Sequence, residues 1–495
     1  MEPFKRFIAW AGRSTQLQTW MISLLVLVIL LIPINFTRAQ QGQPSIPNLA
    51  GFPDPTGVVR TFSENGNIDL TGPFFQSLGT NGRSCATCHQ LSDAMSISAA
   101  HVQARFDQSQ GFDPVFRTND GSNCNHNIDV STLAGRSAAY SLLRTRGLIR
   151  VALDVPAIRD FDVVGVTNPY GCNEANQISM YRRPLPGANL RFLNTVMLDG
   201  RESSSQTGTT PISSSNYPQS LLDDLAHQAL DATLGHAQGQ APGPTAAQQQ
   251  AIVALEISLF TGQAEGNGAG SLDARGAHGG PQAISQQRFF IGINDPVGLD
   301  PTNPVPFNFS TKIFNIFDTW QDPGSPHQQA IARGQMIFNN KTFTITGVAG
   351  LNGTTFSNGV TGPQTIVSTC GVCHDTPNVG NHSVPAPLNI GVADPPGGNN
   401  ALDTSYLPVI TICQRPSLTT CVRTTDPGRA MITGKFNDVG KFKGPILRGL
   451  AARPPYFHNG SAQTLLDVVH FYDARFDIGF TAQEESDLVA FLSSL

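Results

Sequence analysis

The clearest pattern along the chain is a set of apolar residues that repeat at helical spacing. Leucine and alanine recur every three or four positions over residues 221–234, and Asp223 and Asp224 lie in the early turns, where acids suit the helix dipole. Residues 245–260 continue the pattern after Pro244, a favourable residue in a first turn. These features predict two helices in the middle of the chain.

Two more helices are predicted in the second half. Ser325 and Pro326 open an apolar repeat that runs to Phe338. Thr481 and Glu484 form a capping box ahead of a carboxyl-terminal apolar face. No stretch alternates apolar and polar residues long enough to predict a strand. The residue pattern therefore predicts helices and gives no clear strand.

Two stretches have the composition of loops. Residues 263–324 are rich in glycine, proline, asparagine and aspartate, which predicts a long connection between two units. Residues 203–215 are rich in serine and threonine and suggest a surface insertion. With 48 glycines and 35 prolines among 495 residues, we expect a compact protein with much irregular loop.

The amino terminus has the pattern of a targeting segment. An apolar run at residues 21–35 follows three basic residues and precedes Thr-Arg-Ala at 37–39. This is typical of a secretory signal peptide. A retained membrane anchor is the alternative, although the run is shorter than the roughly 20 residues of a spanning helix. Either interpretation of residues 1–39 predicts that the protein is exported, to the periplasm or another extracytoplasmic compartment.

The charge of the chain argues against one class of partner. Charged residues make up 14% of the sequence and the formal net charge is −5. Nucleic-acid binding normally needs an excess of positive charge, so we do not expect it.

Two C-x-x-C-H motifs carry the strongest chemical signal. They are Cys85-Ala-Thr-Cys88-His89 and Cys370-Gly-Val-Cys373-His374. Two thiols three positions apart add to the vinyl groups of one haem, and the adjacent histidine binds the iron. Zinc binding and thiol exchange are alternatives for a C-x-x-C pair. Because the histidine occurs in both motifs and export is predicted, we predict two covalent c-type haems with His89 and His374 as iron ligands.

The four remaining cysteines are candidates for disulfide bonds, as is usual in an exported protein. Cys413 and Cys421 flank a short loop that contains proline and are expected to pair, which leaves Cys124 with Cys172. Four cysteines allow three pairings, and the sequence leaves the choice open.

With these motifs, the chain resembles the di-haem cytochrome c peroxidase/MauG family. The strongest match is DPGRAMITGKFNDVGKFKGPILRGLAARPPYFHNGSAQTLLDVVHFY, residues 426–472. Weaker matches are Gly-Arg-Ser at 135–137, Met-Leu-Asp-Gly-Arg at 197–201 and the helix at 251–259. The resemblance implies two mainly helical cytochrome c-like domains, each with one haem, at residues 40–300 and 301–495.

The resemblance also implies roles for particular residues near the first haem. The glutamine of the family's distal pocket corresponds to Gln228, and its catalytic glutamate corresponds to Gln238. Glutamine cannot exchange a proton, so His236 is the expected substitute, with a structural histidine at a helix end as the alternative. The tryptophan between the family's haems corresponds to Leu198, which leaves Phe192 and Tyr140 as aromatic candidates.

For the second haem, the family's distal methionine or tyrosine corresponds to Tyr472. This residue falls on the apolar face of its predicted helix, so the alternative is a core aromatic residue. Met431 and His382 are rival ligands, and His101 is a candidate for the first haem, with a surface role as its alternative. His458 corresponds to a family histidine near the second haem and is a candidate to hydrogen-bond a propionate, with core packing as the alternative.

The resemblance further implies a calcium site between the haems. Its ligands would be Ser137, in place of the family's asparagine, and the carbonyl groups of Arg453 and Pro455.

The expected function is that of a di-haem peroxidase/MauG-type oxidoreductase. It would reduce hydrogen peroxide, or use peroxide or O2 to oxidise a substrate, and relay electrons between the haems. The partner would be a small periplasmic electron-transfer protein, either a cytochrome c or a copper protein. A non-enzymatic di-haem electron carrier is the alternative.

Overall fold

The fold was examined in a computed structural model, which describes residues 44–124, 128–299, 309–322, 324–356, 359–397 and 401–495. The expected signal segment at 1–39 and the expected domain boundary at 300/301 lie outside the described residues. The chain forms two compact units. The described part of the smaller unit contains β1 (Ser45–Pro47) and β4 (Asn67–Asp69), which pair antiparallel and bring Ile46 opposite Ile68.

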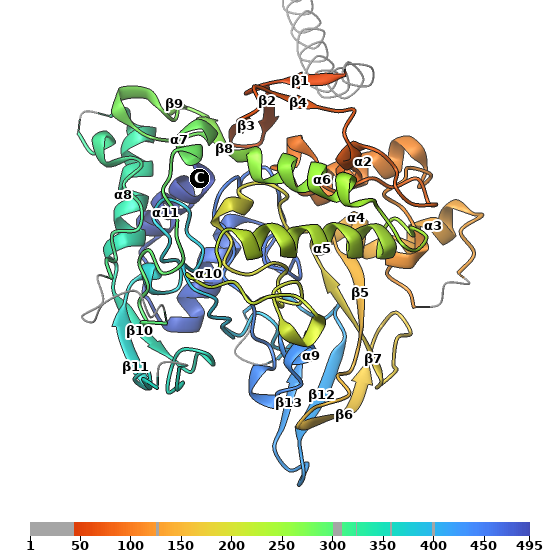
Figure 1. The fold of residues 1–495 in the computed structure, drawn as a ribbon. Helices are drawn as coiled ribbons and strands as arrows, with labels where there is room; N and C mark the ends of the chain where they lie inside the picture. Colours follow the sequence, from red (N-terminus) through yellow and green to blue (C-terminus); the bar gives the residue numbers. More distant parts are fainter. Residues whose placement is uncertain (1–43, 125–127, 300–308, 323, 357–358, 398–400) are drawn as a thin grey trace, which may run out of the picture. The chain divides into compact units, whose positions relative to one another are not determined.

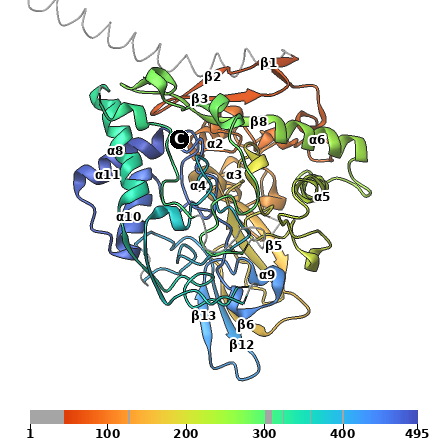
Figure 2. The ribbon, with the colours of Figure 1, turned by 60° about the vertical axis from the view of Figure 1, so that its left-hand side comes forward.

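The larger unit comprises residues 48–66 and 72–495 and contains both C-x-x-C-H motifs. All four helices expected from the sequence are confirmed. They are α5 (Gln219–Gly235), α6 (Ala246–Ser258), α8 (Pro326–Asn340) and α11 (Ala482–Ser493). Capping boxes at Thr245, Ser325 and Thr481 begin the last three. Helices α5 and α6 lie side by side, as do α8 and α11 (Figures 1 and 2).

Shorter helices complete the described helical part of this unit. They are α2 (Ala99–Ser109), α3 (Leu133–Ala139), α4 (Ser141–Arg146), α7 (Pro281–Ser285), α9 (Ala430–Thr433) and α10 (Leu465–Phe476). Helix α10 begins with a capping box between Thr464 and Asp467.

The expectation of a mainly α fold is wrong. Helices hold 30% of the residues that the structure describes, and strands hold a further 18%. One antiparallel sheet has the order β2-β3-β8-β9, and another has the order β13-β12-β6; β5-β7 and β10-β11 are two-stranded. Their bounds are β2 Gly51–Asp54, β3 Gly57–Ser63, β5 Ile149–Asp154, β6 Phe161–Thr167, β7 Gln177–Arg182, β8 Leu259–Gly266, β9 Gly270–Ser271, β10 Phe343–Thr346, β11 Thr365–Ser368, β12 Val409–Gln414 and β13 Cys421–Thr424.

Burial explains why two of these strands, β7 and β8, lack an alternating pattern. The last five residues of β7 and the first five of β8 are all buried. A strand covered on both faces has no need of polar residues at every second position. Strand β12 pairs with β6, so one sheet combines strands from both halves of the sequence (Figure 1).

The two stretches expected to be loops carry more structure than their composition indicates. Residues 263–324 include the end of β8, β9 and α7. In the stretch 203–215, Ser203 and Ser204 are buried, and the Ser203 hydroxyl donates to the Asp224 carboxylate at 2.6 Å. The expectation of a surface insertion there is therefore wrong for its first residues.

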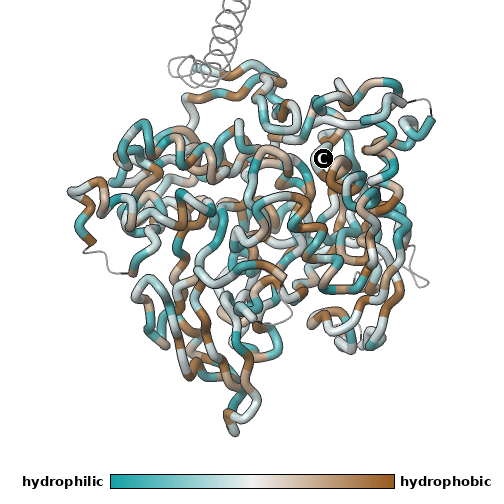
Figure 3. Tube along the Cα trace, turned by 180° about the vertical axis from the view of Figure 1, so that it is seen from behind, coloured by the Kyte–Doolittle hydropathy of each residue, from teal (hydrophilic) through white to brown (hydrophobic). Residues whose placement is uncertain are grey.

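Both expected disulfides are confirmed, Cys124 with Cys172 and Cys413 with Cys421. The second bond links β12 to β13 at the positions where the two strands face each other. None of the helices in the described part of the chain has the length and apolar character needed to cross a membrane. Figure 3 shows hydrophobic and hydrophilic residues intermixed over short distances along that part.

Candidate functional site

The first C-x-x-C-H motif folds into a short 3-10 helix, Cys85–Thr87, that places His89 in a fixed orientation. The backbone N–H of His89 donates to the carbonyl of Cys85 at 3.0 Å. The ring nitrogen Nδ1 lies 2.9 Å from the carbonyl oxygen of Met95, to which it donates as the neutral imidazole. Burial lowers the pKa of His89, which keeps the ring neutral and leaves Nε2 available for a metal.

The second motif repeats this arrangement. Cys370–Val372 forms the 3-10 helix, and the N–H of His374 donates to the carbonyl of Cys370 at 3.1 Å. Its Nδ1 lies 2.7 Å from the carbonyl oxygen of Gly380. Gly380 follows His374 by six residues, and Met95 follows His89 by the same number. Burial lowers the pKa of His374 to about 4. Both histidines are thus prepared in the same way as Nε2 ligands.

The thiols of the motifs are unlike those of redox-active C-x-x-C pairs. Burial raises the pKa of Cys85, Cys370 and Cys373 to about 12, and it also raises that of Cys88. Thiol exchange needs a thiolate and therefore a lowered pKa. The environment of these cysteines consequently disfavours the thiol-exchange alternative.

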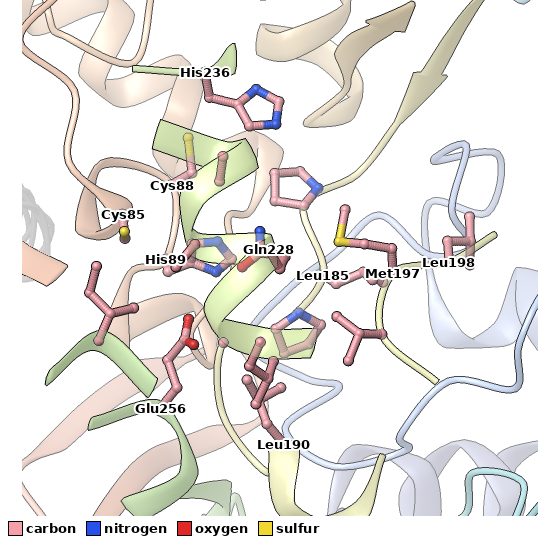
Figure 4. Close-up of a pocket in the computed structure, with 18 of the residues that line it drawn as sticks. Cys85, Cys88, His89, Leu185, Leu190, Met197, Leu198, Gln228, His236 and Glu256 are labelled. Atoms are coloured by element: carbon pink, nitrogen blue, oxygen red, sulfur yellow. The ribbon is translucent and has the colours of Figure 1, made fainter. Parts of the chain in front are cut away.

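A cavity of about 220 Å³ opens beside the first motif and is lined by Cys85, Cys88 and His89. Figure 4 shows these residues with Gln228, His236, Glu256 and several apolar side chains around the same space. Most of the remaining lining is apolar; it includes Leu185, Leu190, Leu193, Met197, Leu198 and Ile252.

The three expected catalytic residues have different positions. Gln228 lies on α5 and His236 at its carboxyl end, and both line the cavity. Gln238 is exposed, has a φ of 53°, and is not among the residues that line the cavity. The structure therefore brings Gln228 and His236, but not Gln238, together with the first motif.

His236 belongs to a buried charged group that the sequence analysis missed. Its Nδ1 lies 2.9 Å from Oδ2 of Asp120, a carboxylate that also pairs with Arg83. Burial by itself raises the pKa of Asp120, but the charges of His236 and Arg83 lower it below its usual value. Asp120 is thus an anion that holds the His236 ring in place. Because 116 residues separate the two, no local sequence pattern indicates this pair.

Glu256 is the second residue that the sequence analysis missed. Its side chain lies on α6, lines the cavity, and has one carboxylate oxygen that is buried without a hydrogen-bond partner among the described residues. Burial raises the pKa of Glu256 to about 8, so the carboxyl is largely protonated at neutral pH. One signal was available: Glu256 is an acid on the same helix face as the apolar residues Ile252 and Val253.

The cavity is also rich in cationic side chains. Arg182, Arg183, Lys443 and Arg453 line it and are buried or half-buried. Burial lowers the pKa of Lys443 to about 8 and that of Arg453 to about 10. Nε of Arg453 is buried without a hydrogen-bond partner among the described residues. A haem presents an apolar ring and two carboxylates, so the apolar lining, these cations and the free Nε2 of His89 fit a c-type haem.

Tyr472 lies beside the second motif. It is on α10 and packs in one apolar cluster with Val372 and Cys373. Burial, followed by the charges of Cys373 and Cys370, raises the pKa of its phenol above the usual range. A phenolate would therefore form here only next to a positive centre such as ferric iron. The role of Tyr472 as an iron ligand stays a prediction.

The rival ligands lie elsewhere. Met431 packs in a different cluster, with Phe161 and Ile410. His382 lines a second cavity, of about 140 Å³, and its Nδ1 lies 3.6 Å from Asp375. Neither belongs to the described apolar cluster that holds Cys373 and Tyr472.

Three further residues were expected near the first haem, and their surroundings differ. His101 is half-exposed, with Nδ1 hydrogen-bonded to the buried Asp93, and is not among the residues that line the first cavity. Leu198 lines both cavities. Phe192 packs edge-on against Phe260, as part of an apolar cluster.

The structure also places Tyr140 and His458, the last two of the expected aromatic and histidine residues. Tyr140 packs against Phe116 and is not among the residues that line the first cavity. His458 is buried, stacks on Phe442, and has Nε2 3.5 Å from Asp426.

The residues expected to hold calcium do not fit that ion. The Ser137 hydroxyl accepts a hydrogen bond from the Arg144 guanidinium, and the carbonyl of Arg453 accepts one from Arg183 at 2.9 Å. Pro455 is buried. Two different guanidinium groups thus already contact two of the three expected ligand oxygens, so a further cation is disfavoured there. Calcium therefore has no part in the proposed function.

Comparison with known proteins gives partial matches. No family model matches the chain. Cytochrome-c peroxidase IdrP1 of Denitromonas iodatirespirans is 41% identical over 81 residues, which is 14% of this chain and 22% of that protein. IdrP1 of Pseudomonas sp. (strain SCT) is 38% identical over 81 residues, 14% of this chain and 21% of that protein. The match thus spans less than a quarter of the length of these relatives.

One solved structure, of a MauG-like protein associated with microbial copper homeostasis, aligns over 86% of this chain and 87% of its own. Its TM-score is 0.34 at 16% identity, a likeness too weak to indicate a shared function. What the comparisons do support is similarity between one segment of this chain and cytochrome-c peroxidases.

Proposed function

We propose that this protein is an exported di-haem c-type cytochrome of the peroxidase/MauG type. It reduces hydrogen peroxide, or uses peroxide or O2 to oxidise a substrate, with electron relay between the haems and a small electron-transfer protein as donor. The carrying observation is that two C-x-x-C-H motifs share one local geometry, and that the first faces a cavity containing Gln228, His236 and Glu256. The similarity to cytochrome-c peroxidases supports the same class of reaction.

The chemistry divides between the cofactor and the chain. When bound, a c-type haem supplies an iron that can take an oxidant and exchange electrons. Reduction of one H2O2 to two waters consumes two electrons and two protons, so the site needs groups that deliver protons. His236, Glu256 and the amide of Gln228 line the cavity where such groups are required.

The chain's own residues divide this work. Asp120 accepts from His236 Nδ1 and fixes the ring, which leaves Nε2 of His236 to exchange a proton. Glu256 holds a proton at neutral pH because burial raises its pKa to about 8. The amide of Gln228 can donate a hydrogen bond to an oxygen atom but cannot transfer a proton.

A second candidate is a non-enzymatic electron carrier, and Met197 is the observation that favours it. Met197 lines the first cavity together with His89. Methionine and histidine together are the axial ligands of electron-transferring cytochromes c. A carrier would hold its first iron fully ligated and would not react with peroxide.

Peroxide turnover by the purified, haem-loaded protein separates the two candidates. We expect the wild type to consume H2O2 with a reduced electron donor, and His236→Ala to lower kcat about 10²–10⁴-fold, the usual contribution of a general acid or base. His278→Ala is the matched control, because His278 is an exposed histidine outside the cavity. A low-spin spectrum unchanged by peroxide, converted to high-spin by Met197→Leu, would instead establish the carrier.

A further inference from the structure

Three potential metal ligands meet on α5 outside the haem cavity. His227 and Asp231 are four residues apart on this helix, so their side chains share one face. Glu202 reaches them from the loop that precedes the helix in the sequence. The ligand atoms of these three residues all lie within 4.8 Å of one another.

The distances between these ligand atoms are close to those around a bound metal ion. Nδ1 of His227 lies 2.7 Å from Oε2 of Glu202 and 4.0 Å from Oδ2 of Asp231. A zinc ion holds nitrogen and oxygen ligands at about 2.0–2.2 Å, so ligand atoms around one ion are roughly 3 Å apart or slightly more. The hydrogen-bonded pair Nδ1 and Oε2 must open by a few tenths of an ångström, and the Asp231 carboxylate, whose side chain is 54% exposed, must move closer.

The local charge favours a cation. The side chain of Glu202 is 3% exposed, so its carboxylate needs a compensating charge. A further acid, Asp224, is near enough to interact electrostatically with both His227 and Glu202. Arg201 provides positive charge, with Nε 3.8 Å from Oε1 of Glu202. Three acids therefore surround one histidine and one arginine.

This group is separate from the proposed peroxide site. Gln228, Ala232 and His236 of α5 line the haem cavity, whereas His227, Asp231 and Glu202 do not. A metal at the second position would tie α5, which carries part of the cavity wall, to the loop around Glu202.

We propose that Glu202, His227 and Asp231 bind a first-row divalent cation such as Zn²⁺. One imidazole nitrogen and two carboxylate oxygens suit zinc or manganese, while Ca²⁺ prefers ligands that are all oxygen. On binding, the proton between Nδ1 and Oε2 leaves this position, the cation takes its place, and the neutral ring carries its proton on Nε2. This inference does not depend on the proposed peroxidase function.

Titration of the full-length, haem-loaded protein with Zn²⁺ by isothermal calorimetry, after a chelator has removed any metal other than the haem iron, tests the site. We expect one Zn²⁺ per chain in the wild type and an affinity at least about tenfold weaker in Asp231→Asn, since even outer groups around a metal contribute about 10–100-fold. Because Asp231 is exposed, this variant should keep the fold, and an unchanged thermal unfolding temperature without zinc verifies it. His227→Ala and Glu202→Gln should likewise weaken binding.

His101→Ala is the matched control. His101 is also a half-exposed histidine whose Nδ1 bonds a buried carboxylate, that of Asp93, but this pair is not part of a three-ligand group among the described residues. Its removal should leave the zinc affinity unchanged. The proposal is overturned if the wild type binds no Zn²⁺, if Asp231→Asn binds as tightly as the wild type, or if His101→Ala weakens binding as much.

Discussion

The guanidinium of Arg182 forms a buried, two-pronged ion pair with the carboxylate of Asp426, 244 residues away in the sequence. Nε donates to Oδ2 at 2.6 Å and Nη2 to Oδ1 at 2.8 Å, while Nη1 pairs with Asp199. All three side chains are at most 5% exposed. Burial alone raises the pKa of Asp199, but the charges of Arg201 and Arg182 lower it below its usual value. The pair fixes the end of β7 to the segment that opens the family-like region at 426–472.

Removing Arg182 should strongly destabilise the fold. Arg182→Met leaves the buried Asp426 carboxylate without its two-pronged partner and leaves Asp199 with Arg201 alone. Breaking a buried pair in this way costs about 3–5 kcal/mol. The free energy of unfolding in urea measures this loss. Arg415→Met is the control. Arg415 pairs with Asp162, and their side chains are 41% and 30% exposed, respectively. Exposed ion pairs contribute only about 0–1 kcal/mol. Equal effects of the two changes would contradict the assigned importance of the buried pair.

Two covalent haems are expected, one at each motif. The double change Cys85→Ala with Cys88→Ala should remove one haem and leave the other, and so should Cys370→Ala with Cys373→Ala, because both attachment points are lost in each case. Intact-mass spectrometry counts the haems. Cys413→Ala with Cys421→Ala removes a disulfide and should leave both haems in place. A wild-type mass with fewer than two haem additions would refute the di-haem proposal.

Tyr472→Phe tests the ligand of the second haem. If the phenolate binds iron, its loss should convert that haem from six-coordinate to high-spin and raise its potential, because an anionic oxygen donor stabilises ferric iron. Optical and EPR spectra with a redox titration measure both effects. Tyr406→Phe is the control, since the Tyr406 hydroxyl donates to the carbonyl of Asn459 at 2.9 Å and has no expected iron. A spectrum that Tyr472→Phe leaves unaltered would make Tyr472 a core residue only.

Glu256 should make stability depend on pH. Its pKa is about 8 in the folded protein, because burial raises it, and near the ordinary value of 4.5 in the unfolded chain. Between these values the folded protein holds a proton that the unfolded chain has released, so stability falls as the pH rises from about 4.5 to about 8. Glu256→Gln removes this pH dependence, because glutamine does not titrate. The free energy of unfolding of the variant should therefore rise relative to that of the wild type over this pH range by a few kcal/mol, at about 1.36 kcal/mol per pKa unit.

Urea denaturation of both proteins at pH 5 and pH 8 measures this change. Glu265→Gln is the comparison, because Glu265 is 44% exposed and paired with Arg60. A stability difference between Glu256→Gln and the wild type that stays constant from pH 5 to pH 8 would show that Glu256 is ionised in the folded protein.

Local features of the sequence by themselves determined the expected helices and the two C-x-x-C-H motifs. Capping boxes at Thr245, Ser325 and Thr481 begin the expected helices because a cap and its partner are three residues apart. Each C-x-x-C-H motif is equally local, since the acceptor for its histidine Nδ1 lies only six residues onward. Such contacts form between neighbours in the chain and leave a readable pattern.

The tertiary structure alone decided the sheets and the composition of the cavity. Strand β3 pairs with β8 about 200 residues away, and the burial of β8 on both faces removes the alternation that predicts a strand. Asp120 reaches His236 across 116 residues, and Glu256 enters the cavity because α6 packs beside α5. Two glutamines ten residues apart, Gln228 inside the cavity and Gln238 exposed, differ only by where α5 ends. These positions depend on packing between distant segments, which residue spacing along the chain does not encode.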